Sequence, residues 1–309
     1  MNSSDWLLKY LTCPLLTNVC SDKLEFDAGL LRCGCGALYG YFSDVPYLRP
    51  IDNRQLPQKE IDGKYQEEMF VNMFALRQYG LLLRKIKELD GYRQIFDIQG
   101  GAENFYQTLL AAIHSYLGQA EVIVDIGCGT GRLTGEMAKA SRSTKVIGID
   151  YSSAMVSKAE QIILSSVDSE IIFPIRMSKI ISINVSTFGW GLDNCAFIVG
   201  DGQYVPIKKA TVDIATCINV FHRLADPKSL LSSVKRILKS NGILLVSNSY
   251  DWKEEFTPRD KWFDQFDSLL DFSEWQKLAE IDGIIYVTPT YNRKFDLAVN
   301  QIGIYRKIL

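Results

Sequence analysis

The feature that most constrains this chain is an apolar run that leads directly into a glycine-rich turn at residues 122–131. The segment reads Val-Ile-Val-Asp-Ile-Gly-Cys-Gly-Thr-Gly and is followed by a helical pattern. Glycine allows the backbone to approach a ligand closely, and the first turn of a helix offers free N–H groups. The spacing differs from the G-x-G-x-x-G of a pyrophosphate-binding turn, and Asp125 would repel a pyrophosphate. The turn therefore predicts a site for a ligand that carries an ammonium or sulfonium group.

Apolar runs alternate with helical patterns on both sides of this turn, which indicates βαβ units and a parallel sheet. The fold class is therefore α/β, with two further strands as a terminal pair. The helix that follows Asp226 is expected to end at a cap formed by Asn241 and Gly242. The expected strands are 122–126, 145–149, 196–199, 212–218, 243–248, 284–288 and 297–305, and the expected helices are 60–90, 103–117, 131–140, 153–165 and 227–238.

The strands that come after the glycine turn end in polar residues. Asp150 ends the second strand, where a carboxylate can accept hydrogen bonds from both hydroxyls of a ribose. Asp201 and Gly202 end the third strand, where an acid can accept from the amino group of an adenine. Asn219 ends the fourth strand. Because ligands of open α/β sheets bind at the carboxyl ends of the strands, we expect these residues in one site.

Taken in order, these segments resemble the class I S-adenosylmethionine-dependent methyltransferases over residues 121–250, through VDIGCGTG, GIDYS, VGDG, VDIATCINVFHRL and LKSNGILLVS. The resemblance implies a Rossmann-like sheet of seven strands with helices on both faces and a reversed final strand. It also implies S-adenosylmethionine as the cofactor, with its methionine part on the glycines, its amino group near Asp125 and its sulfonium beside Asn219. The residues implied to bind the cofactor are Asp125, Gly127, Cys128, Gly129, Gly131, Asp150, Tyr151, Met155, Asp201, Gly202 and Asn219.

A histidine, His222, lies just past the fourth strand, over the expected point of methyl transfer. It could take a proton from an attacking hydroxyl or nitrogen, and we name it as the candidate catalytic residue. Arg223 beside it would lower the pKa of the imidazole and favour the neutral base. The alternative is that His222 only starts a helix and has no chemical role, because many methyltransferases need no more than the proximity of the acceptor to the methyl group.

The segment after the fifth strand, residues 247–262, carries a second resemblance. It is similar to the methyltransferase group that contains the methyltransferase domain of ovothiol (mercaptohistidine) biosynthesis, although Asn248 stands where a proline is usual. Tyr250 and Trp252 offer flat apolar walls to a substrate, and Arg259 could pair with a substrate carboxylate. The alternative is that the tryptophans are core residues.

Four of the seven cysteines fall within the first 35 residues: Cys13, Cys20, Cys33 and Cys35. Four thiolates this close could form a tetrahedral zinc site, although the pairs are not the regular C-x-x-C knuckles. The surrounding sequence resembles the zinc-ribbon domain of the tRNA-methyltransferase activator family, with Leu16 in place of one cysteine. Both alternatives stay open, a zinc site and a metal-free β unit with leftover thiols.

These features divide the chain into a ribbon-like cysteine-containing module (1–50), a linker and helical cap (51–120) and a class I methyltransferase domain (121–309). The residues 166–194 exceed a minimal crossover and could form an extra hairpin, a lid or a dimer surface. No run approaches the roughly 20 apolar residues that span a membrane, and the N-terminus lacks the features of a signal peptide. We therefore expect a cytoplasmic protein and leave its oligomeric state open.

The predicted function is methyl transfer from S-adenosylmethionine to N, O or S of a small-molecule or amino-acid-like acceptor. An RNA or tRNA methyltransferase is one alternative, but 34 Lys and Arg against 36 Asp and Glu argue against a nucleic-acid partner. A methyltransferase fold that serves as a non-catalytic scaffold is the other. A nicotinamide dehydrogenase is disfavoured by Asp125 and by the absence of G-x-G-x-x-G.

Overall fold

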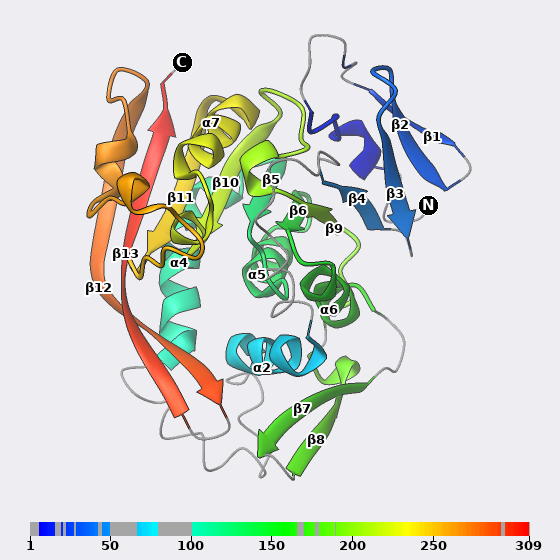
Figure 1. The fold of residues 1–309 in the computed structure, drawn as a ribbon, viewed down its shortest axis with the longest axis vertical. Coiled ribbons are helices and arrows are strands. Elements are labelled where there is room, and N and C mark those ends of the chain that lie inside the picture. The colour runs from blue at the N-terminus through cyan, green and yellow to red at the C-terminus, as the bar shows by residue number, and fades with distance from the viewer. Residues whose placement is uncertain are drawn as a thin grey trace.

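Continuous β-branched and aliphatic runs build the centre of the fold, because strands covered on both faces must be apolar on both sides. A computed structural model describes residues 6–15, 20, 23–27, 29–42, 45–49, 67–79, 101–165, 170–176, 179–188, 190–291 and 294–308. Within these residues one sheet has eleven strands in the order β1-β2-β3-β4-β9-β6-β5-β10-β11-β13-β12 (Figure 1). Its strands are β1 (Leu24–Asp27), β2 (Leu30–Cys33), β3 (Leu38–Phe42), β4 (Val45–Leu48), β5 (Val122–Ile126), β6 (Lys145–Asp150), β9 (Cys195–Gly200), β10 (Val212–Ile218), β11 (Leu238–Asn248), β12 (Trp275–Tyr291) and β13 (Lys294–Lys307).

The last seven strands of this order are the seven-stranded sheet that the sequence predicts. β9, β6, β5, β10 and β11 pair in parallel, and β13 then pairs with β11 in the opposite direction. The chain order across the sheet is thus the third, second, first, fourth, fifth, seventh and sixth strand. The predicted Rossmann-like fold with a reversed final strand is confirmed.

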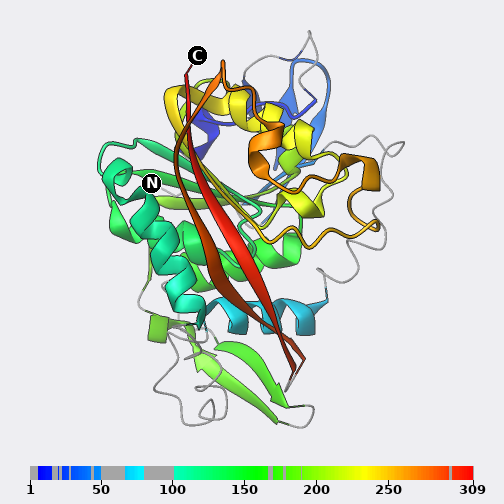
Figure 2. The same cartoon turned by 90° about the vertical axis from the view of Figure 1, so that its left-hand side faces the viewer.

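Alternate residues of the central strands face two separate cores. Ile123 of β5 lies in one core with residues of α4 (Gly101–Leu117), α5 (Arg132–Ala140) and α6 (Ser153–Ile163). Its neighbours Val124 and Ile126 lie in the other core with α7 (Pro227–Ile237). Helices therefore cover both faces of the sheet, and the β12–β13 ribbon crosses beside α4 (Figure 2).

Two expected boundaries differ from the structure. α7 ends at Ile237 and passes directly into β11, so the predicted cap at Asn241 and Gly242 is wrong. Asn241 does take the left-handed conformation of a cap residue, with φ of 64°, but within the bulged start of β11. The terminal pair is also far longer than predicted, because β12 and β13 support each other along their whole length with several register shifts.

The cysteine-containing segment joins the main sheet. β4 pairs in parallel with β9 through Tyr47–Val199 and Leu48–Gly200, and Leu11 forms a bridge with Ile207. Six short 3-10 turns complete the description of these residues: η1 (Leu7–Lys9), η4 (Val185–Phe188), η5 (Gly202–Tyr204), η6 (Phe221–Arg223), and η7 (Arg259–Lys261) and η8 (Phe266–Leu269) before β12.

The remaining elements lie below the sheet in the view of Figure 1. α2 (Glu68–Tyr79) forms part of the helix expected over 60–90, and the rest of that helix lies outside the described residues, as does the expected linker at 51–59. The insertion at 166–194 forms a separate antiparallel hairpin of β7 (Glu170–Arg176) and β8 (Lys179–Asn184). Among the helices that the structure describes, none is both long and apolar enough to span a membrane.

Candidate active site

A cavity of about 1260 Å³ opens at the carboxyl ends of the parallel strands. Its floor is the turn after β5 and the ends of β6, β9 and β10. α2, α4 and the β12–β13 ribbon contribute its outer wall, with Phe74, Arg77, Tyr106, Tyr286 and Leu297 among the lining residues. Open α/β sheets bind ligands at this edge, so the cavity is the expected site.

The glycine turn is held tightly under this cavity. The N–H groups of Gly127 and Cys128 both donate to the carbonyl of Ile149, at 2.7 and 3.0 Å, which fixes the turn to β6. Gly127 has a φ of 75°, and a Cβ there would lie 2.2 Å from a methyl group of Val220. Glycine is therefore required at this position, both for the positive φ and for the close packing of Val220 on the turn.

Asp125, the acid of the first strand, is almost completely buried beneath the turn. Each of its carboxylate oxygens accepts a hydroxyl at 2.6 Å, one from Thr134 and one from Thr216. Burial raises the pKa of Asp125, and the two hydroxyls oppose that rise. The group lines the cavity and supplies negative charge to its floor, as a cationic ligand requires.

The other two acids also lie at the floor of the cavity, and each is fixed by backbone N–H groups. Asp150 accepts from the N–H of Gly129 at 2.8 Å and from that of Ser152 at 2.9 Å. Burial raises the pKa of Asp150 to about 6. Asp201 accepts from the N–H of Gln203 at 2.8 Å, and burial raises its pKa as well. Both carboxylates therefore hold fixed positions and keep free acceptor capacity.

Two contacts at this site were not expected from the sequence. Tyr79 of α2 donates to the carbonyl of Thr130 at 2.7 Å, and the Thr130 hydroxyl donates to Gln78 at 2.5 Å, so α2 is fastened onto the glycine turn. Just past the end of β6, the guanidinium of Arg49, which follows β4, lies 4.6 Å from the ring centre of Tyr151. Both contacts join segments about 50 or more residues apart, and no local pattern in the sequence signals such pairs.

Asn219 lies at the cavity wall in a left-handed conformation, with φ of 56°. Its N–H donates to the carbonyl of Ser247 at 3.0 Å, which fixes the backbone. Its side-chain Oδ1 is buried and has no hydrogen-bond partner among the described residues. A buried acceptor without a partner is rare, and the residue that carries it is one of those that line the cavity.

His222 lies on the same wall and is 2% exposed. Its Nδ1 is 2.8 Å from Oδ1 of Asn248, at the end of β11. The pKa of His222 is lowered to about 4, chiefly by burial and then by the neighbouring Arg223, which acts in the direction the sequence suggested. The ring is therefore neutral near pH 7, as a proton acceptor must be.

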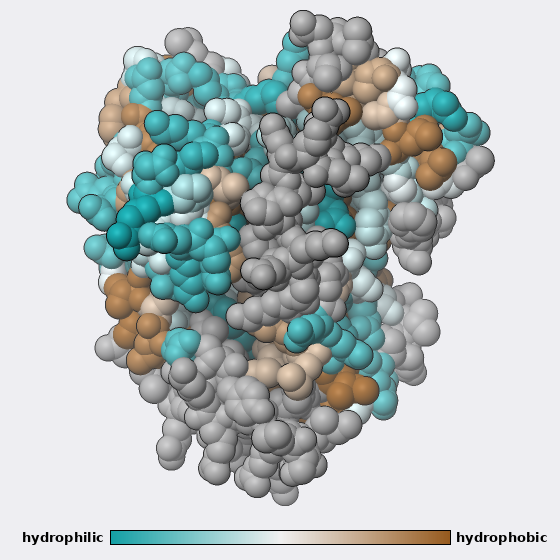
Figure 3. Space-filling model, viewed as in Figure 1, coloured by the Kyte–Doolittle hydropathy of each residue, from teal (hydrophilic) through white to brown (hydrophobic). Residues whose placement is uncertain are grey.

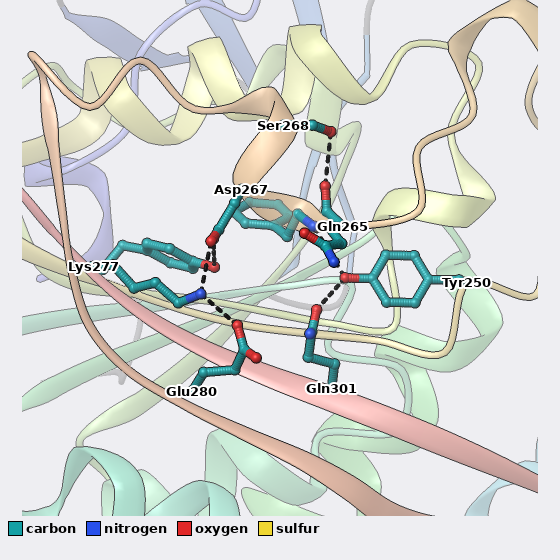
Figure 4. A network of polar contacts seen from close by, with 9 residues as sticks. Tyr250, Gln265, Asp267, Ser268, Lys277, Glu280 and Gln301 are labelled. Carbon is teal, nitrogen blue, oxygen red and sulfur yellow. Dashed lines mark hydrogen bonds and ion pairs between the residues drawn. The ribbon is translucent and has the colours of Figure 1, made fainter.

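The three residues predicted to hold the substrate are engaged elsewhere. The Tyr250 hydroxyl donates to Gln301 and accepts from the N–H of Phe266 at 3.0 Å, in the polar network of Figure 4. Trp252, which is half-buried, donates to the carbonyl of Phe263 at 3.0 Å and stacks on Trp262. Arg259 pairs with Glu254 at 3.0 Å on an exposed turn.

None of these three is among the cavity-lining residues that the structure describes, and their contact with a substrate stays a prediction. The neighbouring residues Ser249, Asp251, Lys253, Glu255 and Phe256 line the cavity instead. Most of them are charged, and the segment between β11 and β12 presents a largely hydrophilic surface (Figure 3).

The four N-terminal cysteines converge although their spacing is irregular. The Sγ atoms of Cys13, Cys20, Cys33 and Cys35 all lie within 4.8 Å of one another, and those of Cys13 and Cys35 are 3.8 Å apart. A tetrahedral zinc with bonds of about 2.3 Å places its sulfurs about 3.8 Å apart. Burial raises the pKa of the Cys13 thiol to about 12, so a cation would be needed to hold it as a thiolate.

The residues of the cavity fit S-adenosylmethionine. The ligand is a cation with a ribose and an adenine, and the floor offers three fixed carboxylates and an unpartnered amide oxygen. The glycine turn leaves room for close approach, and the cavity volume exceeds the about 300–1,000 Å³ usual for ligand pockets. Such a cavity has space for a cofactor and an acceptor together.

The comparisons with known proteins agree with this geometry. Residues 124–246 match the family described as a methyltransferase domain. An uncharacterized 37.1 kDa protein in transposon TN4556 of Streptomyces fradiae is 28% identical over 228 residues, which cover 72% of this chain and 58% of that protein. The ubiquinone biosynthesis O-methyltransferase of Pasteurella multocida (strain Pm70) is 26% identical over 174 residues, 52% of this chain and 63% of that protein.

Among solved structures, the N-methyltransferase NodS of Bradyrhizobium japonicum WM9 superposes with a TM-score of 0.45 at 13% identity, over 67% of this chain and 96% of that chain. The chain spans less than two thirds of the length of the two curated relatives. Residues 124–246, which include the glycine turn and the ends of β6, β9 and β10, thus match a methyltransferase domain, and their strand order is that of the Rossmann-like methyltransferase sheet.

Proposed function

We propose that this chain transfers the methyl group of S-adenosylmethionine to an oxygen, nitrogen or sulfur of a small-molecule acceptor. The observation that carries the proposal is the row of fixed carboxylates at the ends of β5, β6 and β9 beneath one cavity. The cofactor supplies a methyl group on a sulfonium, which is already a strong electrophile. The name of the Pasteurella relative, an O-methyltransferase, favours oxygen as the accepting atom.

Each residue of the site would have a role that follows from its position. Asp150 would accept from the ribose hydroxyls, Asp201 would face the adenine, and the glycine turn with Asp125 would hold the methionine part. Asn219, whose buried Oδ1 has no partner among the described residues, would lie beside the sulfonium. His222, neutral near pH 7, would take the proton that the acceptor loses.

A small-molecule acceptor is favoured over RNA by charge and by shape. The chain has a formal net charge of −2, whereas a nucleic-acid partner favours a basic surface. The cavity wall includes Phe74, Tyr106, Tyr286 and Leu297, which suit an acceptor with apolar surface. The resemblance of residues 247–262 to the ovothiol group would add an amino-acid-like acceptor.

The test is calorimetry with S-adenosylmethionine, followed by transfer of a radioactive methyl group to a set of phenols, amines and thiols and to bulk tRNA. We expect one cofactor per chain and label in a small molecule. Label in tRNA alone would overturn the small-molecule acceptor. Failure to bind the cofactor would instead favour the non-catalytic scaffold.

We propose further that Cys13, Cys20, Cys33 and Cys35 hold a structural zinc ion. The convergence of four Sγ atoms, with one pair at tetrahedral separation, supports this proposal. Metal analysis of the purified protein should give one zinc per chain, and Cys33→Ser should lose it and lower the melting temperature. Cys217→Ala, in the buried strand β10, is the matched control and should keep the zinc. Purified protein that contains no zinc, together with a melting temperature that Cys33→Ser leaves unchanged, would contradict the proposal.

A further inference from the structure

The Asn248 side chain makes two contacts that together fix the hydrogen positions at the candidate base. Its Oδ1 is 2.8 Å from Nδ1 of His222 and 2.9 Å from the backbone N of Tyr250. Asn248 is 1% exposed, so water does not compete for these contacts. Tyr250 has a φ of 54°, and this tight turn brings its N–H back toward the end of β11.

The identities of these atoms follow from the backbone. The N–H of Tyr250 can only donate, so the Asn248 atom that faces it is the oxygen and not the nitrogen. That oxygen can only accept, so Nδ1 of His222 must carry the hydrogen of the 2.8 Å contact. In a neutral imidazole the other nitrogen, Nε2, then has the free lone pair.

The surroundings keep the ring in this neutral form. Burial has the largest effect and lowers the pKa of His222 to about 4, and Arg223 and Lys253 act in the same direction. The hydrogen bond with Asn248 and the charge of Asp251 act in the opposite direction. Asp251 is also paired with Arg223 at 3.1 Å, which offsets part of each charge.

We propose that Asn248 is a positioning residue that locks His222 in the Nδ1–H tautomer, so that Nε2 is the proton acceptor on the cavity side. This inference rests on the proposed methyl transfer and adds a substrate class to it. The acceptor must carry a hydrogen on its attacking atom, as a hydroxyl, a thiol or a primary or secondary amine does. A tertiary amine or a thioether needs no base, and such acceptors would leave this arrangement without a role.

With an alcohol as the acceptor, its oxygen would form a bond to the methyl carbon, and the bond between that carbon and the sulfonium sulfur would break with its electron pair going to sulfur. The hydroxyl proton passes to Nε2, which gives an imidazolium with both nitrogens protonated. Solvent then removes this proton readily, because burial and Arg223 disfavour the charged ring.

The test reads the tautomer directly and does not depend on a known acceptor. The chain has two histidines, and His114 is exposed on α4, so the His114→Gln variant leaves His222 as the single histidine. Long-range proton–nitrogen correlation spectra of this nitrogen-15-labelled protein should show a pure Nδ1–H tautomer at pH 7. A dominant Nε2–H tautomer would overturn the proposal.

Two substitutions of Asn248 in the same background separate positioning from folding. Asn248→Ala should give a mixture of tautomers, and Asn248→Asp should keep the Nδ1–H form while its carboxylate raises the pKa of the ring. Asn184→Ala, at the end of β8 in the separate hairpin, is the control and should leave both readouts unchanged. Retained binding of S-adenosylmethionine shows that each variant is folded. Pure Nδ1–H in Asn248→Ala would contradict the assignment.

A catalytic readout distinguishes this inference from the proposed function. With catechol as the hydroxyl probe and trimethylamine as the probe without a transferable hydrogen, we expect methyl transfer to catechol only. Asn248→Ala should lower kcat for catechol about tenfold or more at an unchanged KM for the cofactor. Cofactor binding with transfer to trimethylamine alone would overturn the inference and leave the methyltransferase assignment intact.

Discussion

The two sides of the cavity differ in how their polar groups are partnered. At the ends of β5, β6 and β9, the carboxylates of Asp125, Asp150 and Asp201 all accept hydrogen bonds from within the chain. At the ends of β10 and β11, Asn219 Oδ1 and Asn248 Nδ2 are buried with no partner among the described residues. An unsatisfied buried polar atom costs about 1–3 kcal/mol, so the polar groups of the β10–β11 side are less completely partnered than those of the β5–β6–β9 side.

This difference suggests that the two sides serve different parts of the reaction. The polar groups of the β5–β6–β9 side are already fixed in position. This favours cofactor binding, because no side chain then has to be ordered when the complex forms. The β10–β11 side holds the one neutral base and the unpartnered amide groups. Substitutions on the first side should therefore change affinity for the cofactor, and those on the second side should change the rate of transfer.

The largest effect is expected from His222→Gln, on the β10–β11 side. Loss of a general base lowers a rate by about 10²–10⁴-fold, so transfer to a hydroxyl probe should fall by at least about 10²-fold. Affinity for S-adenosylmethionine, measured by calorimetry, should not change. His114→Gln on the exposed side of α4 serves as control. An equal loss of cofactor affinity would remove the distinction between the two sides.

Asp150→Ala tests the opposite side. Two hydrogen bonds from ribose hydroxyls to a carboxylate contribute about 1.5–3 kcal/mol each, so affinity for S-adenosylhomocysteine should fall on the order of 100-fold. Asp213→Ala is the control, because Asp213 caps the N–H groups of Glu121 and Val122 at the far end of β5. If Asp150→Ala binds as tightly as the unchanged protein, the ribose assignment is wrong.

A smaller effect should appear in the pH dependence. Burial raises the pKa of Asp150 to about 6, and the ribose hydroxyls need its charged form as acceptor. Cofactor affinity is thus full above this pKa and lost as the pH falls through it, by about tenfold between pH 7 and pH 5. Calorimetry across this range measures it, and Asp150→Asn should flatten the profile.

The pH dependence of the rate of transfer at saturating cofactor should differ from that of the cofactor affinity. The pKa of His222 is lowered to about 4, so the neutral base is present throughout pH 5–8 and is protonated only below that range. The turnover number should be constant where the affinity is already falling. A turnover number that falls together with the affinity near pH 6 would contradict the separate roles.

Tyr79→Phe should have the smallest effect. It removes the 2.7 Å hydrogen bond that fastens α2 to the carbonyl of Thr130, and a buried hydrogen bond of this kind contributes about 1 kcal/mol. We expect cofactor affinity to fall about fivefold and the melting temperature to drop by a few degrees, with no change in turnover. A change in turnover at saturating cofactor would show that α2 also acts on the other side.

The sequence predicted the two sides unequally, for a physical reason. The apolar strands and the acids that end them are local patterns, so β5, β6, β9 and the positions of Asp125, Asp150 and Asp201 could be read directly. The pairing of His222 with Asn248 joins residues 26 positions apart through strand register, and only the folded sheet brings them together. The same holds for β4 against β9 and for the length of β12 and β13.

Residues 249–259 show how a correct segment can still mislead about its side chains. The sequence indicated that this segment borders the site, and Ser249 and Asp251 do line the cavity. The aromatic rings of Tyr250 and Trp252 instead pack on Phe263. The direction of these rings depends on the turn at Tyr250, and no sequence pattern predicts the positive φ of that residue.

We expect the cofactor to bind on the β5–β6–β9 side, with its reacting end toward Asn219 and His222. A crystal structure with S-adenosylhomocysteine would show this position. Both ribose hydroxyls should lie within hydrogen-bond distance of Asp150, and the sulfur should lie beside Asn219. A ligand bound elsewhere, or a ribose that does not contact Asp150, would contradict it.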